Sequence, residues 1–217
     1  MAMITEVILA RHGEAHCNLA GIAGGDKTCT GLTDRGRQQV TRLAARLREE
    51  QESGAPFNVL YAAPRRRVLE SADILAAALG LPVHIEPGLS GPRHGEADGQ
   101  RWEEIKTAFG GPPQSDPDRP YAPGSETWNE YLARATACLA GLTQRHARQR
   151  VLITGHAETI EAAFTLMLAL PAGSSARAGF ATDHASLTCW HMRRNRFGQE
   201  VWLLTAFNDT RHLAGVP

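Results

Sequence analysis

The sequence predicts an α/β fold, a single three-layer sandwich with a mostly parallel central sheet and helices on both faces. Two observations carry this prediction. Short apolar segments, partly β-branched and typical of buried strands, alternate along the chain with longer segments whose apolar residues recur at helical spacing. Strands that alternate with helices favour a parallel sheet, because the helices act as crossovers that cover its faces.

The first half of the chain contains three strands and three helices in this interpretation. The strands are expected at residues 4–10, 57–61 and 82–85, and the helices at residues 34–52, 64–79 and 102–109. Thr33 is a suitable N-cap for the first helix, and Pro64 is expected at the first position of the second, where proline is favoured. Residues 14–31 and 86–100 are rich in glycine and are expected to be loops.

The second half begins with an irregular segment, residues 110–124, which holds five prolines. We interpret it as an insertion at the rim of a pocket. A long helix is expected from Ser125, followed by a strand at 149–154, a helix after His156, and strands at 186–193 and 201–207. No shift in composition marks a linker, so residues 1–217 are expected to form one domain.

Charge and cysteine usage exclude several classes of protein. Lys and Arg together number 23, as do Asp and Glu, so there is no broad field to attract nucleic acid or an anionic membrane. The longest apolar stretches are too short to span a bilayer. The four cysteines are scattered without a CxxC pair, which indicates reduced thiols and no zinc site. With no recognisable signal peptide, we expect a cytoplasmic protein without a metal or other cofactor, and the sequence leaves a homodimer open.

Polar side chains follow three of the predicted strands at the points where these strands end. Arg11 and His12 follow the first strand, a run of three arginines at 65–67 follows the second, and His156 follows the strand at 149–154. In an α/β sheet, functional groups gather at the carboxyl ends of the strands, so we expect these side chains to lie together. Guanidinium groups match phosphate oxygens, and a neutral imidazole is a good nucleophile. The pattern therefore predicts a site for a phosphate dianion.

These residues also lie within motifs that resemble those of the histidine phosphatase superfamily, the phosphoglycerate-mutase-like proteins. Residues 9–18 (LARHGEAHCN) resemble the family signature, and residues 30–39 (TGLTDRGRQQ) resemble the stretch that follows it. Residues 63–72 (APRRRVLESA) resemble the motif that carries the family's second arginine, which places it at Arg67. Residues 123–126 (PGSE), 154–156 (TGH) and 207–213 (FNDTRHL) resemble later motifs in the same order. The resemblance therefore covers nearly the whole chain.

The resemblance implies a metal-independent phosphatase that acts on a small phosphorylated metabolite. His12 would attack phosphorus and become phosphohistidine. Three residues would bind the peripheral phosphate oxygens: Arg11, Arg67 and His156. Further contacts to the phosphate or the substrate are implied for Asn18 and for the backbone amides near Gly13 and Ala157. Phosphoryl transfer depends on positioning and charge stabilisation, and this set of residues supplies both.

One position departs from the family pattern. Counting back from the family's glycine pair, here Gly95 and Gly99, the usual acidic proton donor falls on Gly91, which has no carboxylate. An alcohol leaving group needs a proton, so another group must supply it unless the substrate has a good leaving group. Glu158, two residues after His156 at a helix start, is the first candidate. The alternatives all lie in the loop after Gly91: His94, Glu96 and Asp98.

The favoured function is hydrolysis of the phosphate monoester of a small metabolite, and three alternatives remain. These are a phosphoglycerate-type phosphomutase, a phosphatase of phosphohistidine or phosphotyrosine in proteins, and a non-catalytic module that binds phosphorylated ligands. The departure at Gly91 argues against the mutase and suits the good leaving groups of phosphoproteins. The intact set of two arginines and two histidines argues against the non-catalytic module.

Overall fold

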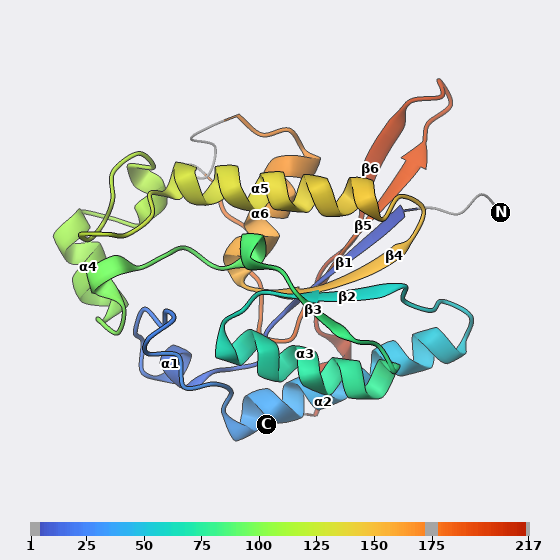
Figure 1. Ribbon diagram of the computed structural model, residues 1–217, viewed down its shortest axis with the longest axis horizontal. Coiled ribbons are helices and arrows are strands. Elements are labelled where there is room, and N and C mark those ends of the chain that lie inside the picture. The colour runs from blue at the N-terminus through green and yellow to red at the C-terminus, as the bar shows by residue number, and fades with distance from the viewer. Residues whose placement is uncertain (1–4, 172–177, 216–217) are drawn as a thin grey trace.

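The computed structural model describes residues 5–171 and 178–215. Six strands form one sheet in the order β3-β2-β4-β1-β5-β6 (Figure 1). The strands from β3 to β1 pair in parallel, whereas β5 pairs antiparallel with both β1 and β6. This mostly parallel sheet has helices on both faces, so the predicted α/β sandwich is confirmed.

All predicted strands and helices occur, although Ile4, the first residue of the first predicted strand, lies outside the described residues. The strands are β1 (Thr5–Arg11), β2 (Val59–Ala62), β3 (Val83–Ile85), β4 (Arg150–Gly155), β5 (Leu187–Arg194) and β6 (Glu200–Asp209). The helices are α1 (His16–Leu19), α2 (Asp34–Glu52), α3 (Arg66–Leu79), α4 (Trp102–Phe109), α5 (Trp128–Arg145) and α6 (Ala157–Met167). In the described part of the chain, no helix combines the length and the apolar character needed to cross a membrane.

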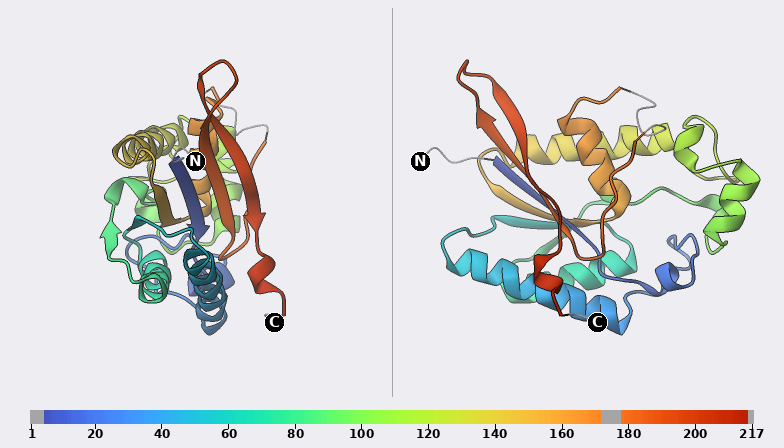
Figure 2. Two further views of the ribbon diagram at one scale, coloured as in Figure 1. Left: turned by 90° about the vertical axis from the view of Figure 1, so that its right-hand side faces the viewer. Right: turned by 180° about the vertical axis from the view of Figure 1, so that it is seen from behind.

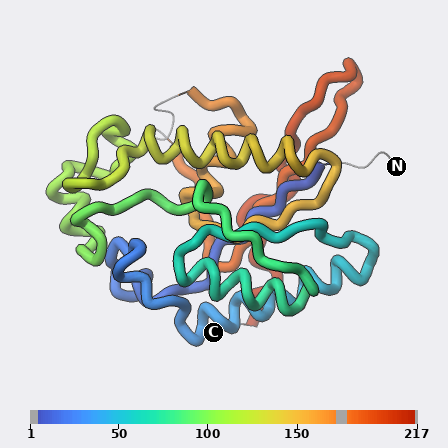
Figure 3. The backbone as a smooth tube through the Cα atoms, viewed as in Figure 1, coloured from blue at the N-terminus to red at the C-terminus, as the bar shows by residue number. Residues whose placement is uncertain are grey.

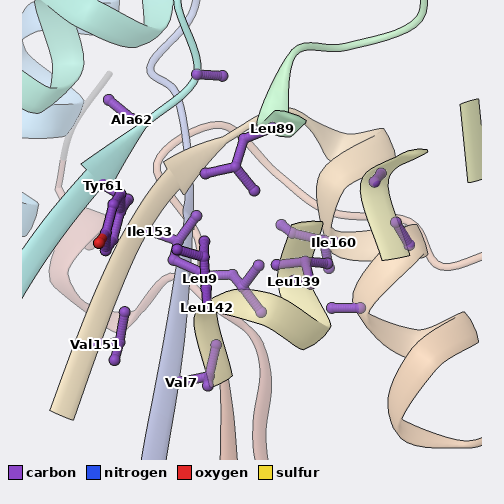
Figure 4. Close-up of a cluster of buried hydrophobic side chains, with 14 of the residues drawn as sticks. Val7, Leu9, Tyr61, Ala62, Leu89, Leu139, Leu142, Val151, Ile153 and Ile160 are labelled. Carbon is purple, nitrogen blue, oxygen red and sulfur yellow. The ribbon is translucent and has the colours of Figure 1, made fainter. Parts of the chain in front are cut away.

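Two apolar cores, one on each face of the sheet, hold the three layers together. Helices α2 and α3 cover one face, and α5 and α6 cover the other (Figures 1 and 2). Successive residues of β1 contribute to opposite cores: Val7 and Leu9 pack with α5 and α6, whereas Ile8 packs with α2 and α3. Figure 4 shows the first of these cores, in which Leu139 of α5 meets the side chains of the central strands. The alternation follows from the two-residue period of a strand and explains why the central strands are apolar throughout.

Two helix starts differ from their predicted positions. Helix α3 begins at Arg66, and its N-cap is Arg65 in an extended conformation, so Pro64 precedes the helix instead of occupying its first turn. Helix α5 begins at Trp128, because Thr127 and Glu130 form a capping box that satisfies the first backbone amides. The short helix α1 lies within the predicted loop 14–31 and has too few residues to show a period.

The register of the parallel strands aligns their carboxyl ends. Arg11 of β1 lies opposite Gly155 of β4, and Ala62 of β2 lies opposite Thr154. Beyond this edge, the segment around α1 lies beside the segment that carries α4, where the backbone amide of Ala23 bonds to the carbonyl of Gln100 (Figure 3). The residues that follow β1, β2 and β4 therefore lie close together at this edge. The segments that carry α1 and α4 lie beyond them.

Candidate active site

His12 follows β1 directly and is buried, with 3% of its surface exposed. Its Nδ1 lies 2.7 Å from the carbonyl oxygen of Gly13, and its Nε2 lies 3.0 Å from Nε of Arg67. A carbonyl only accepts and a guanidinium only donates, so Nδ1 carries the proton and Nε2 presents its lone pair. Burial, followed by the charges of Arg67 and Arg11, lowers the pKa of His12 well below 6.5. His12 is therefore neutral at pH 7, the form needed for a nucleophile.

Arg67 lies in the first turn of α3 and contacts both histidines of the site. Besides its bond to His12, its Nη1 donates to the carbonyl of Gly24 at 2.7 Å, and its Nη2 lies 3.2 Å from Nδ1 of His156. Among the described residues, no carboxylate forms an ion pair with this guanidinium. Burial of a cation that no carboxylate neutralises is costly, and an anionic ligand would reduce that cost.

His156 is the N-cap of α6 at the end of β4 and is 1% exposed. Its Nδ1 accepts from Arg67, so in the neutral ring the proton lies on Nε2. Burial, then the charges of Arg67 and Arg65, lowers its pKa well below 6.5, so the ring is neutral. Nε2 is buried and has no hydrogen-bond partner in the described part of the chain. The ring meets that of His12 edge-on, with 5.4 Å between centroids, so His156 offers an N–H donor beside the nucleophile.

Arg11, the last residue of β1, completes the set on the other side of His12. Its Nη1 donates to the carbonyl of Thr182, and its Nη2 donates to Nε2 of His184 at 3.2 Å. Its buried Nε has no partner among the described residues. His184, whose ring centroid is 5.8 Å from that of His12, was not singled out from the sequence, because nothing local links residue 184 to residue 11. The structure therefore brings together the four residues that were predicted to hold and receive the phosphoryl group.

These motifs and this geometry agree with the comparison to known families. The sequence profile of the histidine phosphatase superfamily (branch 1) matches residues 7–205. The chain belongs to this superfamily. The predicted family is thus confirmed, and with it the predicted class of enzyme, a histidine phosphatase.

Relatives of this histidine phosphatase include a metal-independent phosphoserine phosphatase of Arabidopsis thaliana. The two sequences are 26% identical, and the match covers 98% of this chain and 85% of the relative. An uncharacterized phosphatase of Bacillus subtilis is also 26% identical, with 98% of both chains covered. Among solved structures, a mycobacterial glucosyl-3-phosphoglycerate phosphatase has the same fold, with a TM-score of 0.78 and 21% identity over 94% of this chain and 99% of that one.

Gly91, the position that departs from the family pattern, lies against Arg65 and His156. A Cβ atom added at Gly91 would lie 2.7 Å from Nη1 of Arg65 and 3.1 Å from Cδ2 of His156. The buried guanidinium of Arg65 therefore occupies the space into which a side chain at residue 91 would project. Arg65 was seen in the sequence only as part of an arginine run, and its burial beside His156 could not be read from that run.

The four candidate proton donors have different surroundings in this histidine phosphatase. Asp98 accepts bonds from the backbone amides of Gly25 and Lys27 and from Thr28, and the hydrogen bonds lower the pKa of Asp98 against the effect of its burial. Glu96 is exposed. His94 is buried, and its Nδ1 lies 2.6 Å from the hydroxyl of Tyr121.

Burial and the charge of Arg65 lower the pKa of His94 to about 4, so its ring is neutral at pH 7. Glu158 is half-buried in the first turn of α6 and forms no hydrogen bond or ion pair with another described residue. Neither the Glu96 nor the Glu158 carboxylate has a bond to another described residue, and we prefer Glu158 because it is half-buried and lies two residues after His156.

A cavity of about 340 Å³ includes Glu158 in its wall, whereas Arg11, His12, Arg67 and His156 are not among its lining residues. Trp102, Tyr121 and Trp128 supply aromatic surface, and Gln114 comes from the irregular segment 110–124. The predicted role of this segment as the rim of a pocket is therefore supported by the contacts of Gln114 and its neighbouring prolines. Trp128 serves twice, because it also belongs to the core beneath α5.

The remaining predicted contacts take local roles in this structure. The amide of Gly13 donates to Oγ of Ser71 at 3.2 Å, and the side chain of Asn18, an exposed residue, accepts from the amide of Ala15 at 3.0 Å. Ala157 occupies the first position of α6, next to His156. Their contact with a phosphate stays a prediction. For Gly13 it requires exchange of the bond to Ser71, whereas Asn18 accepts through Oδ1 and could still donate through Nδ2.

Proposed function

We propose that this histidine phosphatase hydrolyses the phosphate monoester of a small metabolite through a phosphohistidine intermediate on His12. The observation that carries this proposal is the pair of imidazoles that Arg67 holds in opposite roles. His12 presents a lone pair at Nε2, whereas His156 presents an N–H at Nε2. A positioned nucleophile and a surrounding set of donors are what phosphoryl transfer requires.

In the first step, Nε2 of His12 attacks phosphorus, and the bond between phosphorus and the ester oxygen breaks. Arg11, Arg67 and the N–H of His156 bind the three peripheral oxygens and stabilise their charge. His156 is neutral, so the positive charge comes from the two arginines, which the protein has already placed beside His12. Nε of Arg67 gives up its bond to Nε2 of His12 in this step, and this frees the lone pair for the attack. The ester oxygen takes a proton from Glu158 and leaves as an alcohol, while the phosphoryl group remains on His12.

In the second step, water attacks the phosphohistidine, and the bond between phosphorus and Nε2 breaks. Glu158, now a carboxylate, accepts a proton from this water, so one residue serves first as acid and then as base. Orthophosphate leaves, and His12 regains its lone pair. Glu158 is preferred over Asp98 as the donor because backbone amides already hold the Asp98 carboxylate in its ionised form.

The substrate class is supported by the cavity and by the relatives. A volume of about 340 Å³ falls at the lower end of the range for small-molecule sites, which suits a small organic alcohol. The names of two of the similar proteins described above refer to phosphoserine and to glucosyl-3-phosphoglycerate, both of them small phosphate monoesters. We therefore propose a metabolite phosphatase in preference to a phosphomutase.

The test is phosphate release from p-nitrophenyl phosphate and a panel of metabolite monoesters, with EDTA present, for wild type and His12→Ala. We expect turnover by wild type and none by the variant, together with transfer of ³²P from labelled substrate to wild type alone. Product analysis for an isomerised ester separates hydrolysis from mutase activity. Full activity of His12→Ala would show that the proposed nucleophile is wrong.

Two further proposals concern the protein as a whole. A cytoplasmic location is supported by the four cysteines, all of which are free thiols, and cell fractionation would test it. A homodimer stays a prediction, which size-exclusion chromatography with light scattering would test.

A further inference from the structure

Arg65 is a third guanidinium group at the site, and the two steps above do not use it. Its side chain is only 2% exposed. Nε donates to Oδ1 of Asp26 at 3.0 Å, and Nη2 donates to the carbonyl of Pro92 at 2.5 Å. Nη1 has only a long contact of 3.5 Å, to Nε2 of His94. One end of this buried cation is therefore firmly bonded, while the other has donor capacity left.

The weakly bonded end of Arg65 faces His156. The point where a Cβ of Gly91 would stand lies 2.7 Å from Nη1 of Arg65 and 3.1 Å from Cδ2 of His156. Cδ2 is bonded to Nε2, the buried atom of His156 that has no partner among the described residues. Nη1 of Arg65 and Nε2 of His156, two donors that lack good acceptors, thus both lie near Gly91, which has no side chain to separate them.

The charge of Arg65 is only partly offset within the protein. Asp26 bonds to Arg65, but its side chain is 72% exposed, so solvent screens much of its charge. Among the described residues, no other carboxylate forms an ion pair with Arg65. An anion of the substrate that bonded to Nη1 would offset this buried charge.

We propose that Arg65 binds a second anionic group of the substrate, a carboxylate or a phosphate carried by the leaving group within a few bonds of the ester oxygen. This inference rests on the proposed function, because it places the transferred phosphoryl group on His12 and against His156. An anion attached near the ester oxygen would then reach Nη1 of Arg65 across Gly91. Any larger residue at 91 would displace the guanidinium, so Gly91 and Arg65 form one specificity-determining unit.

Matched pairs of substrates test this role. In the first pair, phosphoserine has a carboxylate that phosphoethanolamine lacks. In the second pair, 3-phosphoglycerate has a carboxylate where glycerol 3-phosphate has a hydroxymethyl group. Glycerol 1,3-bisphosphate replaces the carboxylate by a phosphate and so distinguishes the two sources of charge. We expect wild type to prefer the doubly anionic member of each pair by about 10- to 100-fold in kcat/KM, the range for a hydrogen bond between charged groups.

Substitution of Arg65 should reduce this preference. Arg65→Gln is expected to bring the ratio of kcat/KM within each pair close to one, and Arg65→Lys to restore part of it. Arg66→Gln is the matched control, because Arg66 is an exposed neighbour that bonds to Glu70, and its ratio should equal that of wild type. The ratio separates binding of a second anion from a structural role, which would lower kcat/KM equally for both members.

Two results would overturn the inference. One is a wild-type ratio near or below one in both carboxylate pairs and for the bisphosphate, a measurement that needs no variant. The other is an unchanged ratio in Arg65→Gln. Dissociation constants of His12→Ala for the same pairs give the ratio without turnover, so the role of Arg65 is decided even if wild type hydrolyses none of these esters. If His12→Ala is active, the ratio of kcat/KM decides it instead.

Discussion

Replacement of Arg67 by lysine keeps the positive charge and removes the fork that organises the site. In the native protein, three nitrogen atoms of Arg67 bond separately to His12, Gly24 and His156, at 3.0, 2.7 and 3.2 Å. A lysine ammonium is a single nitrogen atom and cannot occupy three positions. Arg67→Lys therefore loses most of these bonds, including the one that fixes the tautomer of His156 unless the ammonium remakes it, and leaves the tautomer of His12 to the carbonyl of Gly13. The net charge of the site stays the same.

The size of the effect follows from what those bonds do. Loss of one preorganised donor to a developing oxyanion lowers kcat by about 10²- to 10³-fold, or about 2.7–4 kcal/mol. Lysine retains one contact and the charge, so we expect Arg67→Lys to fall near the lower end, about 10²-fold in kcat. The bond from Nη1 to the carbonyl of Gly24 joins a charged donor to a buried acceptor. Such bonds contribute about 1.5–3 kcal/mol, so we expect the free energy of unfolding to fall by up to this amount if the bond is lost.

The assay is steady-state phosphate release at pH 7, with thermal and urea unfolding of the same preparations. Arg66→Lys is the control, because it makes the same chemical change one residue away on the exposed side of α3. We expect the control to match wild type in both measurements. If Arg67→Lys retained kcat within threefold of wild type, the fork would not matter, and charge alone would account for the site.

Two further predictions concern acid and base chemistry. Glu158→Gln should lower kcat by about 10²- to 10⁴-fold for alkyl phosphates and much less for p-nitrophenyl phosphate, whose leaving group needs little protonation; equal losses for both would contradict the role of Glu158 as acid. Acid should also unfold the protein, because burial lowers the pKa of His12, His94, His156 and His184 below 6.5. As pH falls below 6.5, these histidines take up protons in the unfolded chain but not in the folded one, so the folded state loses stability. The slope approaches about 1.4 kcal/mol per pH unit for each histidine. Urea unfolding at pH 7, 6 and 5 measures this slope, and equal stabilities at these three values would refute the argument.

The elements of the fold could be predicted from local patterns because each pattern records burial. The strands β1 and β4 are apolar at nearly every position, since helices cover both faces of the sheet, and α2 and α5 show the single apolar face of a surface helix. Two helix starts differ from the local patterns. Arg65, and not Pro64, caps α3, because its extended conformation carries the guanidinium back toward Gly91 and Pro92, and that contact is not local in sequence.

The candidate site was predicted in part for the same reason. Its principal residues follow strands directly, and parallel strands bring their carboxyl ends to one edge, so Arg11, His12 and His156 could be placed from the strand pattern. Arg67 was placed by its motif. His184 was missed because it reaches the site through the antiparallel pairing of β5 with β1, a contact between distant parts of the chain.

By itself, the sequence determined the fold class, the family and the four groups that would hold and receive a phosphoryl group. These depend on periodicity and on residues at fixed distances from strand ends. Only the tertiary structure decided which nitrogen of each histidine carries the proton, because Arg67, from another element, bonds to both rings and the carbonyl of Gly13 bonds to that of His12. It also placed Arg65 against Gly91 and set a cavity beside Glu158. Hydrogen bonds and burial between elements far apart in the chain determine these features, and no local pattern records them.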